Sequence, residues 1–371
     1  MEDVRTIEKE TQIGTSGHTG YTIHGIQHLG VGVPKHAEAW KWYRKFFGLD
    51  IPLFNDEADA ALMTIYTNDE VICKRAAMVL NLKGGCAMEV VCPTTFKARH
   101  ADIAHQLGDL GIYIGTVKAP DVRKAYQFYK DNGVALVSEI AVMPNGWETF
   151  YLKDPNGLLF QILPDAETYT NSRHVTGGTA GCSIGVSNMK KALKFYSIFG
   201  YDETIYDESG SFDDWRNLPG GSGSYHRILL RQSQPSGGGF SKLTGNTFIE
   251  LVQDLSNRTP IKIYEGRMWG DIGFIHLGFD IRNMDSLGAS LQSIGHGFTC
   301  DTRNVLSMGA STKVHCTYTE DPDGTLIEMI EVYKMPIIEK FGIYLNVEKR
   351  KPSQPLPDMM LKALRFMRVK D

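Results

Sequence analysis

Three features are scarce or absent in this 371-residue sequence, and each absence excludes a class of protein. Charge of one sign does not dominate, because 39 Lys and Arg stand against 43 Asp and Glu, which gives a formal net charge of -4. This balance argues against nucleic acid or an anionic membrane as a partner bound through bulk charge. No apolar run approaches the roughly 18 residues of a membrane helix, and residues 1–22 are polar, without the apolar stretch of a secretory signal. We therefore expect a cytoplasmic protein that binds a small molecule.

Closely spaced cysteine pairs are also missing. The six cysteines include no CxxC motif, and most lie inside apolar runs. Buried free thiols are therefore expected, rather than a disulfide framework.

What the sequence does contain is a unit that recurs four times. Each unit begins with a short β-type run, continues with a helical segment that carries aromatic residues near its end, and closes with a β-run that carries Glu or Gln. The opening runs lie at 26–33, 111–115, 181–186 and 274–278, and the closing runs at 87–91, 154–161, 248–252 and 321–330. Each unit thus predicts a strand, a helix and then two or three further strands.

Linker positions divide the chain into two halves. The predicted divisions are a polar extension at 1–22, units 1 and 2 at 23–164, a linker at 165–178, units 3 and 4 at 179–332, and a tail with a short helix at 333–371. Unit 3 also contains Gly/Ser-rich stretches at 220–224 and 235–239, which predict mobile loops.

The motifs within these units resemble those of the vicinal oxygen chelate superfamily. The His-Leu-Gly opening, the Phe-Tyr pair near the helix end and the closing Asp-Pro-x-Gly-x-x-x-Glu are similar to glyoxalase I, methylmalonyl-CoA epimerase, fosfomycin-resistance proteins and extradiol dioxygenases. The resemblance covers about residues 23–332. It implies an α+β fold in which four βαβββ modules pair into two curved, incomplete β-barrels. It also implies a metal held by the first and last strands of two paired modules.

The resemblance assigns two ligand positions to each module. These are His28 and Glu89 in module 1, Tyr113 and Gln161 in module 2, Gly181 and Glu250 in module 3, and His276 and Glu328 in module 4. If module 1 pairs with module 4, one site gathers both His and two Glu. If the modules pair in sequence order, the C-terminal barrel offers Glu250, His276 and Glu328 instead. We favour the first pairing because it explains the distribution of ligands with one assumption, and we retain the second as the alternative.

Chemistry favours a metal in either pairing. A lone His on an apolar strand is usually a core residue, but here two His recur in register with two Glu, and buried unpaired carboxylates are costly. Imidazole and carboxylate ligands suit Ni, Co, Fe, Mn or Zn, and the absence of thiolates argues against a structural zinc site. We expect one divalent ion with two positions open to substrate oxygens.

Three functions are compatible with such a site. The first is a lyase or isomerase acting through a metal-chelated enediolate or enolate, with Glu328 or Glu89 as the base, as the glyoxalase resemblance implies. The second is an Fe(II)-dependent extradiol-type dioxygenase, because two His and one Glu form a facial set and Tyr318 stands where that class has a signature tyrosine. The His expected upstream of Tyr318 is missing, and Tyr151 in module 2 suggests a tyrosine common to the modules. The third is a non-catalytic binding or resistance protein, which the repeated His and Glu argue against.

Substrate contacts are expected near the Gly-rich stretches of unit 3. Two arginines beside a mobile loop, Arg227 and Arg231, could hold a carboxylate or phosphate, with His226 and Trp215 close by in sequence. An exposed charged loop would explain these residues equally well. The repeated modules are compatible with a monomer or a homodimer.

Overall fold

The structure, a computed structural model, describes residues 20–234, 237–303, 306–308, 312–338, 343–347 and 350–370. Most of the expected N-terminal extension, residues 1–19, and Pro235 and Ser236 of the second Gly/Ser-rich stretch lie outside this part of the chain. Among the described residues, no helix has the length and apolar character needed to cross a membrane.

Modules 1 and 2 each contain a strand, a helix and further strands, as expected. Module 1 consists of β1 (Thr22–Gly32), α1 (His36–Phe47), β2 (Ile51–Asp59), the short 3-10 helix η1 (Ala61–Tyr66), β3 (Cys73–Leu80) and β4 (Ala87–Pro93). Module 2 consists of β5 (Gly111–Ala119), α2 (Val122–Asp131), β6 (Ala135–Leu136), β7 (Ala141–Val142), β8 (Glu148–Lys153) and β9 (Leu159–Pro164).

Modules 3 and 4 repeat the order with additional short elements. Module 3 contains β10 (Thr179–Gly185), α3 (Met189–Ile198), β11 (Tyr201–Gly210), η2 (Asp213–Trp215), β12 (Tyr225–Gln232), α4 (Ser241–Thr244) and β13 (Phe248–Asp254). Module 4 contains β14 (Gly273–Arg282), α5 (Met284–Ser293), β15 (Cys300–Asp301), β16 (Leu306–Met308), β17 (Thr312–Glu320) and β18 (Leu326–Ile338).

The C-terminal region departs from the expected tail at its start. Strand β18 continues past 332 to Ile338 and pairs with β19 (Ile343–Asn346), so the segment after module 4 begins as sheet. The expected short helix follows as α6 (Asp358–Ala363) and η4 (Leu364–Met367).

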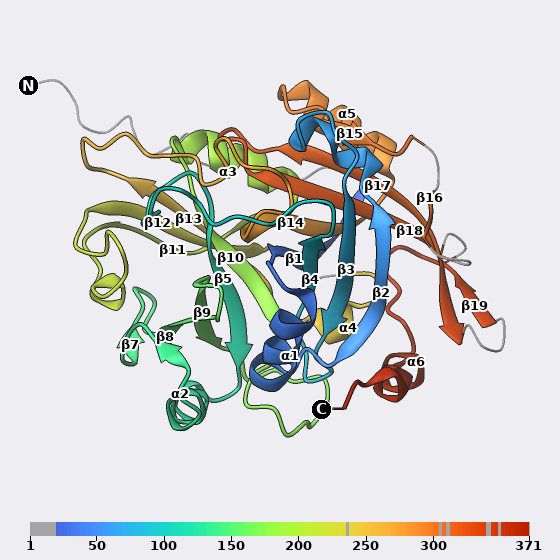
Figure 1. The fold of residues 1–371 in the computed structure, drawn as a ribbon, viewed down its shortest axis with the longest axis horizontal. Coiled ribbons are helices and arrows are strands. Elements are labelled where there is room, and N and C mark those ends of the chain that lie inside the picture. Colours follow the sequence, from blue (N-terminus) through green and yellow to red (C-terminus); the bar gives the residue numbers. More distant parts are fainter. Residues whose placement is uncertain are drawn as a thin grey trace, which may run out of the picture.

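Two mixed sheets organise the molecule, and each takes one module from each half of the sequence (Figure 1). The first runs β15-β17-β18-β14-β1-β4-β3-β2 and joins modules 4 and 1 through the antiparallel pair β1 and β14. The second runs β11-β12-β13-β10-β5-β9-β8-β6 and joins modules 3 and 2 through β10 and β5. The pairing is therefore 1 with 4 and 2 with 3, the exchanged arrangement favoured by the sequence, in an α+β fold.

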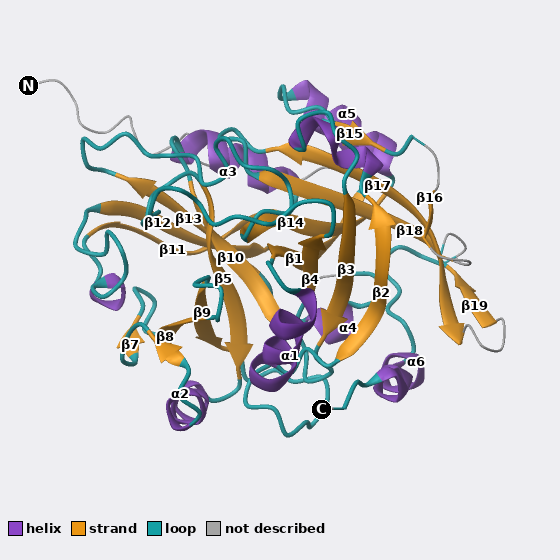
Figure 2. Ribbon diagram, viewed as in Figure 1, coloured by secondary structure: helices purple, strands orange, loops and turns teal. Residues whose placement is uncertain are grey.

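Local sequence sets the ends of the helices. Asp121 and Asn188 cap α2 and α3, because their side chains accept hydrogen bonds from the backbone N–H of Lys124 and Lys191. Helix α1 ends at Gly48, whose φ of 63° lies in the left-handed region that glycine adopts without strain. The helices flank the sheets, which form the middle of the molecule (Figure 2).

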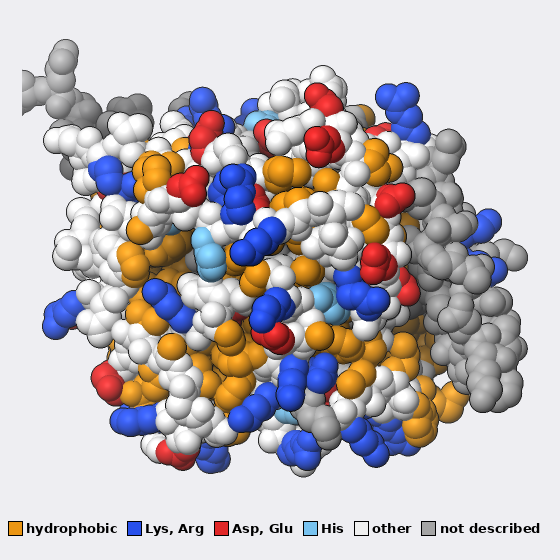
Figure 3. All heavy atoms as spheres, in the orientation of Figure 1, with side chains coloured by type: hydrophobic (Ala, Val, Ile, Leu, Met, Phe, Trp, Pro, Cys, Tyr) orange, Lys and Arg blue, Asp and Glu red, His pale blue; other side chains and the backbone are white. Residues whose placement is uncertain are grey.

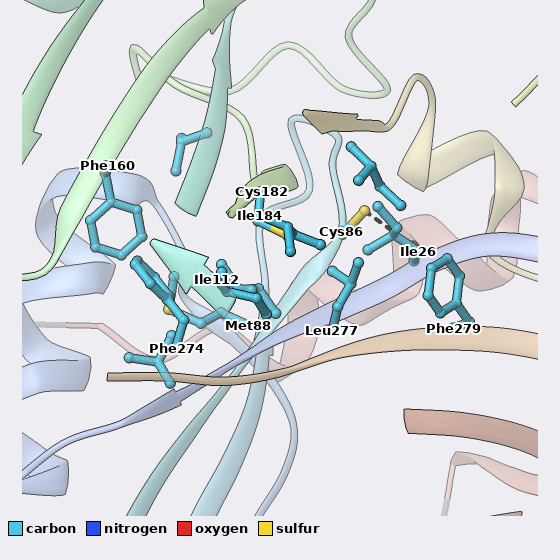
Figure 4. Close-up of a cluster of buried hydrophobic side chains, with 14 of the residues drawn as sticks. Ile26, Cys86, Met88, Ile112, Phe160, Cys182, Ile184, Phe274, Leu277 and Phe279 are labelled. Carbon is cyan, nitrogen blue, oxygen red and sulfur yellow. Dashed lines mark hydrogen bonds between the residues drawn. The ribbon is translucent and has the colours of Figure 1, made fainter. Parts of the chain in front are cut away.

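The main core lies between the two sheets, where their central strands face each other. Leu277 and Phe279 of β14 lie on one side of it, and Cys182 and Ile184 of β10 on the other (Figure 4). All six cysteines are free, as expected from their spacing; Cys86, Cys182 and Cys300 are buried, and the other three are half-buried. On the outer face shown in Figure 3, basic, acidic and apolar side chains are interspersed.

Candidate metal centre

Strand register brings the two outer modules together at one point of the first sheet. Gly30 on β1 pairs with His276 on β14 and with Glu89 on β4. Symmetrically, Gly278 on β14 pairs with His28 on β1 and with Glu328 on β18. Each half of the cluster is therefore a His and a Glu on either side of a glycine.

The two glycines explain the His-Leu-Gly motif that opens modules 1 and 4. A Cβ atom at Gly30 would collide with the ring of His276, and one at Gly278 would collide with the ring of His28. Each imidazole lies across the glycine that follows the other histidine by two residues. Any larger residue at either position would push one ring out of the cluster.

Four donor atoms converge at this crossing, and all four residues are buried. His28 Nε2 lies 2.9 Å from His276 Nε2 and 2.8 Å from Glu328 Oε2. His276 Nε2 lies 3.2 Å from Glu328 Oε2 and 3.3 Å from Glu89 Oε2. His28 Nε2 and Glu89 Oε2 are farther apart, at 4.0 Å.

These separations fit a six-coordinate ion. Bonds of about 2.1 Å place neighbouring donors at right angles about 3.0 Å apart and opposite donors about 4.2 Å apart. The four short separations match the first value, and the 4.0 Å separation between His28 and Glu89 matches the second. Four protein donors in this arrangement would leave two adjacent positions for substrate oxygens.

Unsatisfied polar atoms within the cluster also fit a bound cation. Glu328 Oε2 is buried and accepts no hydrogen bond of good geometry, although both imidazole nitrogens lie within 3.2 Å of it. A buried carboxylate oxygen without a donor is expensive, and a divalent ion would compensate it. The cluster suggests a divalent metal site formed by His28, Glu89, His276 and Glu328.

Charges in the cluster hold its carboxylates ionised. Burial opposes the charged form of Glu89, but the ammonium of Lys74 and the ring of His276 lower its pKa to about 2. Burial also opposes protonation of His276, but the carboxylates of Glu328 and Glu89 raise its pKa to about 9. Without an ion the cluster therefore retains a proton on His276, which a bound cation would displace.

Three neighbouring side chains contact the carboxylates. The hydroxyl of Tyr318 donates to Glu328 Oε1 at 2.5 Å, and the Cys316 thiol lies 3.1 Å from the same oxygen. On the other side, Lys74 Nζ donates to Glu89 Oε1 at 3.3 Å. Tyr318 was expected from the sequence, whereas Lys74 was not. Only the register of β3 and β4, which places Met78 opposite Glu89, shows that Lys74, four residues before Met78, lies on the same face.

Tyr318 has a counterpart in module 2. It lies opposite Glu328 in its sheet, as Tyr151 lies opposite Gln161 in the other. The tyrosine is thus common to these two modules, although its partner is a cluster carboxylate only in module 4.

The equivalent place in the second sheet holds no histidine. Glu250 accepts hydrogen bonds from Ser183, Tyr206 and Arg227 there, and it does not approach His276 or Glu328. The alternative set of Glu250, His276 and Glu328 is therefore divided between two sheets. The position that corresponds to His28 is Gly181 in module 3, as expected.

In module 2 the ligand position is one residue away from the expected one. Strand β9 aligns Gln161 with Thr116, as β4 aligns Glu89 with Gly30, so the counterpart of His28 is Ile114 rather than Tyr113. The hydroxyl of Tyr113 donates to the carbonyl of His105. The expected equivalence was wrong because one residue of slip moves a side chain to the opposite face of a strand.

Residues expected to bind substrate near the Gly-rich stretches lie in module 3, three of them on β12 and Trp215 in η2. Arg227 is fully buried on β12, where its guanidinium binds Glu250 and Asp214 and stacks 3.9 Å from the ring centroid of Trp215, also buried. Arg227 and Trp215 thus belong to the interior rather than to an exposed loop. His226 and Arg231 pair with Asp207 and Glu203 on β11. None of the four contacts the His/Glu cluster.

Part of the sequence matches a known protein family, and the fold is similar to that of solved structures. Residues 25–162 match the family model described as the Glyoxalase/Bleomycin resistance protein/Dioxygenase superfamily. No curated protein sequence matches the chain. Among solved structures, glyoxalase I from Zea mays is similar, with a TM-score of 0.52 and 12% identity over 85% of this chain and 94% of that one. A putative dioxygenase from Bacillus subtilis is similar with a TM-score of 0.51 and 14% identity, over 84% of this chain and 86% of that one.

The structural similarities, at such low identity, establish the fold. The family match covers module 1 and nearly all of module 2, and the two sheets repeat the same module four times. The chain therefore has a glyoxalase-like α+β fold built from four modules, and its residues 25–162 match the glyoxalase/bleomycin resistance protein/dioxygenase superfamily.

Proposed function

We propose that this protein is a divalent-metal-dependent lyase or isomerase, of the glyoxalase or epimerase kind, that acts on an oxygen-rich small molecule. The observation that supports the proposal is the convergence of two imidazoles and two carboxylates, all buried, at separations that suit one six-coordinate ion. When bound, the ion would supply Lewis acidity to two neighbouring oxygens of a substrate.

The two carboxylates are held differently, which favours one of them as the base. Glu328 has one oxygen held by Tyr318 and Cys316 and the other within 3.2 Å of both imidazole nitrogens. Glu89 has one oxygen held by Lys74, and its Oε2 lies farther from the imidazole nitrogens, at 3.3 and 4.0 Å. We assign proton abstraction to Glu89 Oε2, with Glu328 as the fixed carboxylate.

Lys74 has a supporting part in this assignment. Its ammonium lies 3.3 Å from Glu89 Oε1, the oxygen that does not face the imidazoles. A cation at that position stabilises the ionised carboxylate and orients its other oxygen toward the cluster. Lys74 is thus a positioning residue for Glu89.

Oxygen chemistry with Fe(II) is the second candidate, because His28, His276 and Glu328 form a two-His-one-carboxylate set with Tyr318 beside it. The second carboxylate, Glu89, favours the first candidate, since it adds a fourth donor and a base.

Proton exchange tests the proposal without knowledge of the natural substrate. Metal-loaded protein is incubated in D₂O with small α-hydroxy carbonyl compounds, and exchange at the carbon beside the carbonyl is followed by proton NMR. We expect exchange with the wild type and a loss of at least 100-fold in Glu89→Gln. Oxygen consumption by the Fe(II)-loaded protein, without proton exchange, would support the dioxygenase instead.

A further inference from the structure

The helix near the end of the chain carries apolar side chains on its outer side as well as on its inner side. Eight large hydrophobic side chains of the described residues are exposed, and three of them, Met359, Phe366 and Met367, lie in α6 and η4. Met359 and Phe366 are the most exposed of the eight, at 81% and 79%. A helix on the surface of a globular protein normally turns polar residues to the solvent, so this outer side is unusual for a helix that faces water alone.

Basic side chains flank the exposed apolar ones. Met359 and Phe366 are seven positions apart in the sequence, close to two helical turns, so their side chains lie on the same side of the helix. Lys362 is exposed beside them, and the guanidinium carbon of Arg365 lies 4.9 Å from the ring centroid of Phe366. We call Met359, Lys362, Arg365, Phe366 and Met367 the tail patch.

Contacts on the inner side hold the helix to the body of the protein. Leu361 is buried, and the carboxylate of Asp358 accepts a hydrogen bond from Lys242 Nζ at 2.7 Å. Beyond the helix, Arg368 Nε lies 3.0 Å from Asp50 Oδ2. Figure 1 shows α6 at the periphery of the molecule. The helix is therefore fixed at both ends, with the tail patch directed outward.

Positive charge dominates this region, although the whole chain has a formal net charge of -4. Residues 350–370 contain six Lys or Arg and one acidic residue, Asp358. Helix α1, whose last turn is also basic, ends three residues before Asp50, the partner of Arg368. At the lower right of Figure 3, around the place of α6, basic and hydrophobic side chains lie side by side. The local charge is thus opposite in sign to the overall charge.

We propose that the tail patch binds the surface of a bilayer that contains anionic phospholipid. The Phe and Met side chains would enter the interfacial region, to the depth of about 5–10 Å that is typical of a helix lying in the plane of a membrane. The Lys and Arg side chains would face the lipid phosphates. The proposal does not depend on the proposed function.

A bilayer suits the tail patch better than a protein partner does. The helix is fixed on the body of the protein, so it cannot adapt its position to a preformed groove. A deformable surface needs no pocket shaped for Phe366 and Met359. Binding through a few apolar side chains and a few charges would be reversible.

Sedimentation of the full chain with vesicles tests the proposal. Phosphatidylcholine vesicles are compared with vesicles that contain about 30% phosphatidylglycerol, at low salt and at about 0.5 M salt. We expect binding to the anionic vesicles to be at least fivefold tighter at low salt, and most of this difference to disappear at high salt. Absence of binding to the anionic vesicles would overturn the proposal.

Variants of the tail patch test its apolar and cationic parts separately. Phe366→Ser should weaken binding to the anionic vesicles at least fivefold through loss of buried apolar surface. Lys362→Gln should weaken it about fivefold, the effect of one basic charge near an anionic surface. Ile103→Ser, at an exposed apolar residue, and Lys190→Gln, at an exposed lysine of α3, are the matched controls and should bind as the wild type does. Circular dichroism confirms that each variant is folded.

The competing occupant of the tail patch is a second copy of the chain. Light scattering over a range of concentrations would then show a dimer that Phe366→Ser dissociates, without binding to vesicles, and this result would overturn the proposal. Equal binding to both kinds of vesicle, or binding that is unchanged in both Phe366→Ser and Lys362→Gln, would also overturn it.

Discussion

Two glycines are as necessary to the geometry of the cluster as its four ligands are. Gly30 and Gly278 each leave room for the imidazole of the opposite module, so the His-Leu-Gly motif reflects a steric requirement as well as a ligand. This explains why the motif is intact in modules 1 and 4.

Gly30→Ala tests this requirement. The added Cβ would collide with the ring of His276 and move its Nε2 from the cluster, so we expect metal affinity to fall at least tenfold while the protein stays folded. Titration with Mn²⁺ and circular dichroism measure the two quantities. Gly239→Ala is the control, because its Cβ would meet only ordinary contacts at 3.4 Å or more. Unchanged affinity in Gly30→Ala would contradict the role of the glycine.

Protonation of His276 predicts the pH dependence of metal binding. Its pKa of about 9 means that the metal-free ring is protonated at neutral pH, and binding must expel that proton. Affinity for Mn²⁺ should therefore rise by up to tenfold for each pH unit between about 6.5 and 9. Titrations at three pH values would show this, and an affinity that is flat over the range would contradict it.

At the scale of single elements, local sequence patterns were sufficient to locate the main helix of each module. Proline and glycine punctuation placed α1 between His36 and Phe47, within two residues of the expected start. Repetition of the β-runs gave the first and last strand of each module. The continuation of β18 to Ile338 was missed, because its pairing with β19 is a contact between segments that the local pattern does not reveal.

Predictions for single residues failed where strand register or side-chain packing determines which residues are in contact. The position of Ile114 rather than Tyr113 depends on how β5 aligns with β9. Lys74 was missed because nothing in the sequence shows that its side chain reaches Glu89. Arg227 was expected beside a mobile loop, either as a substrate contact or as an exposed charge, but β12 buries it against Glu250. These are tertiary effects that one-dimensional patterns do not contain.

The second sheet offers a test of this burial. Arg227 compensates Glu250 and Asp214 in a site without a histidine, and removal of one partner from a buried ion pair costs about 3–5 kcal/mol. We expect Arg227→Met to lower the free energy of unfolding by this amount in urea, while metal content per folded chain stays as in the wild type. Arg231→Met, at an exposed pair, should change stability by less than about 1 kcal/mol.

At the scale of the whole molecule, the pairing of module 1 with module 4 places all four candidate ligands in one sheet. Modules 1 and 4, the first and last in sequence, meet through β1 and β14 and bring together both histidines. Modules 2 and 3 meet through β5 and β10, with Arg227 beside the one carboxylate that corresponds to a ligand. The family model matches modules 1 and 2, which lie in different sheets, so the site crosses the boundary of that match.

We predict one metal ion per chain, bound where modules 1 and 4 meet. The most direct measurement is elemental analysis of anaerobically purified, folded protein, comparing the wild type with His28→Ala and Glu250→Gln. We expect about one equivalent of a divalent metal in the wild type and in Glu250→Gln, and almost none in His28→Ala. Metal retained in His28→Ala but lost from Glu250→Gln would contradict the site between modules 1 and 4.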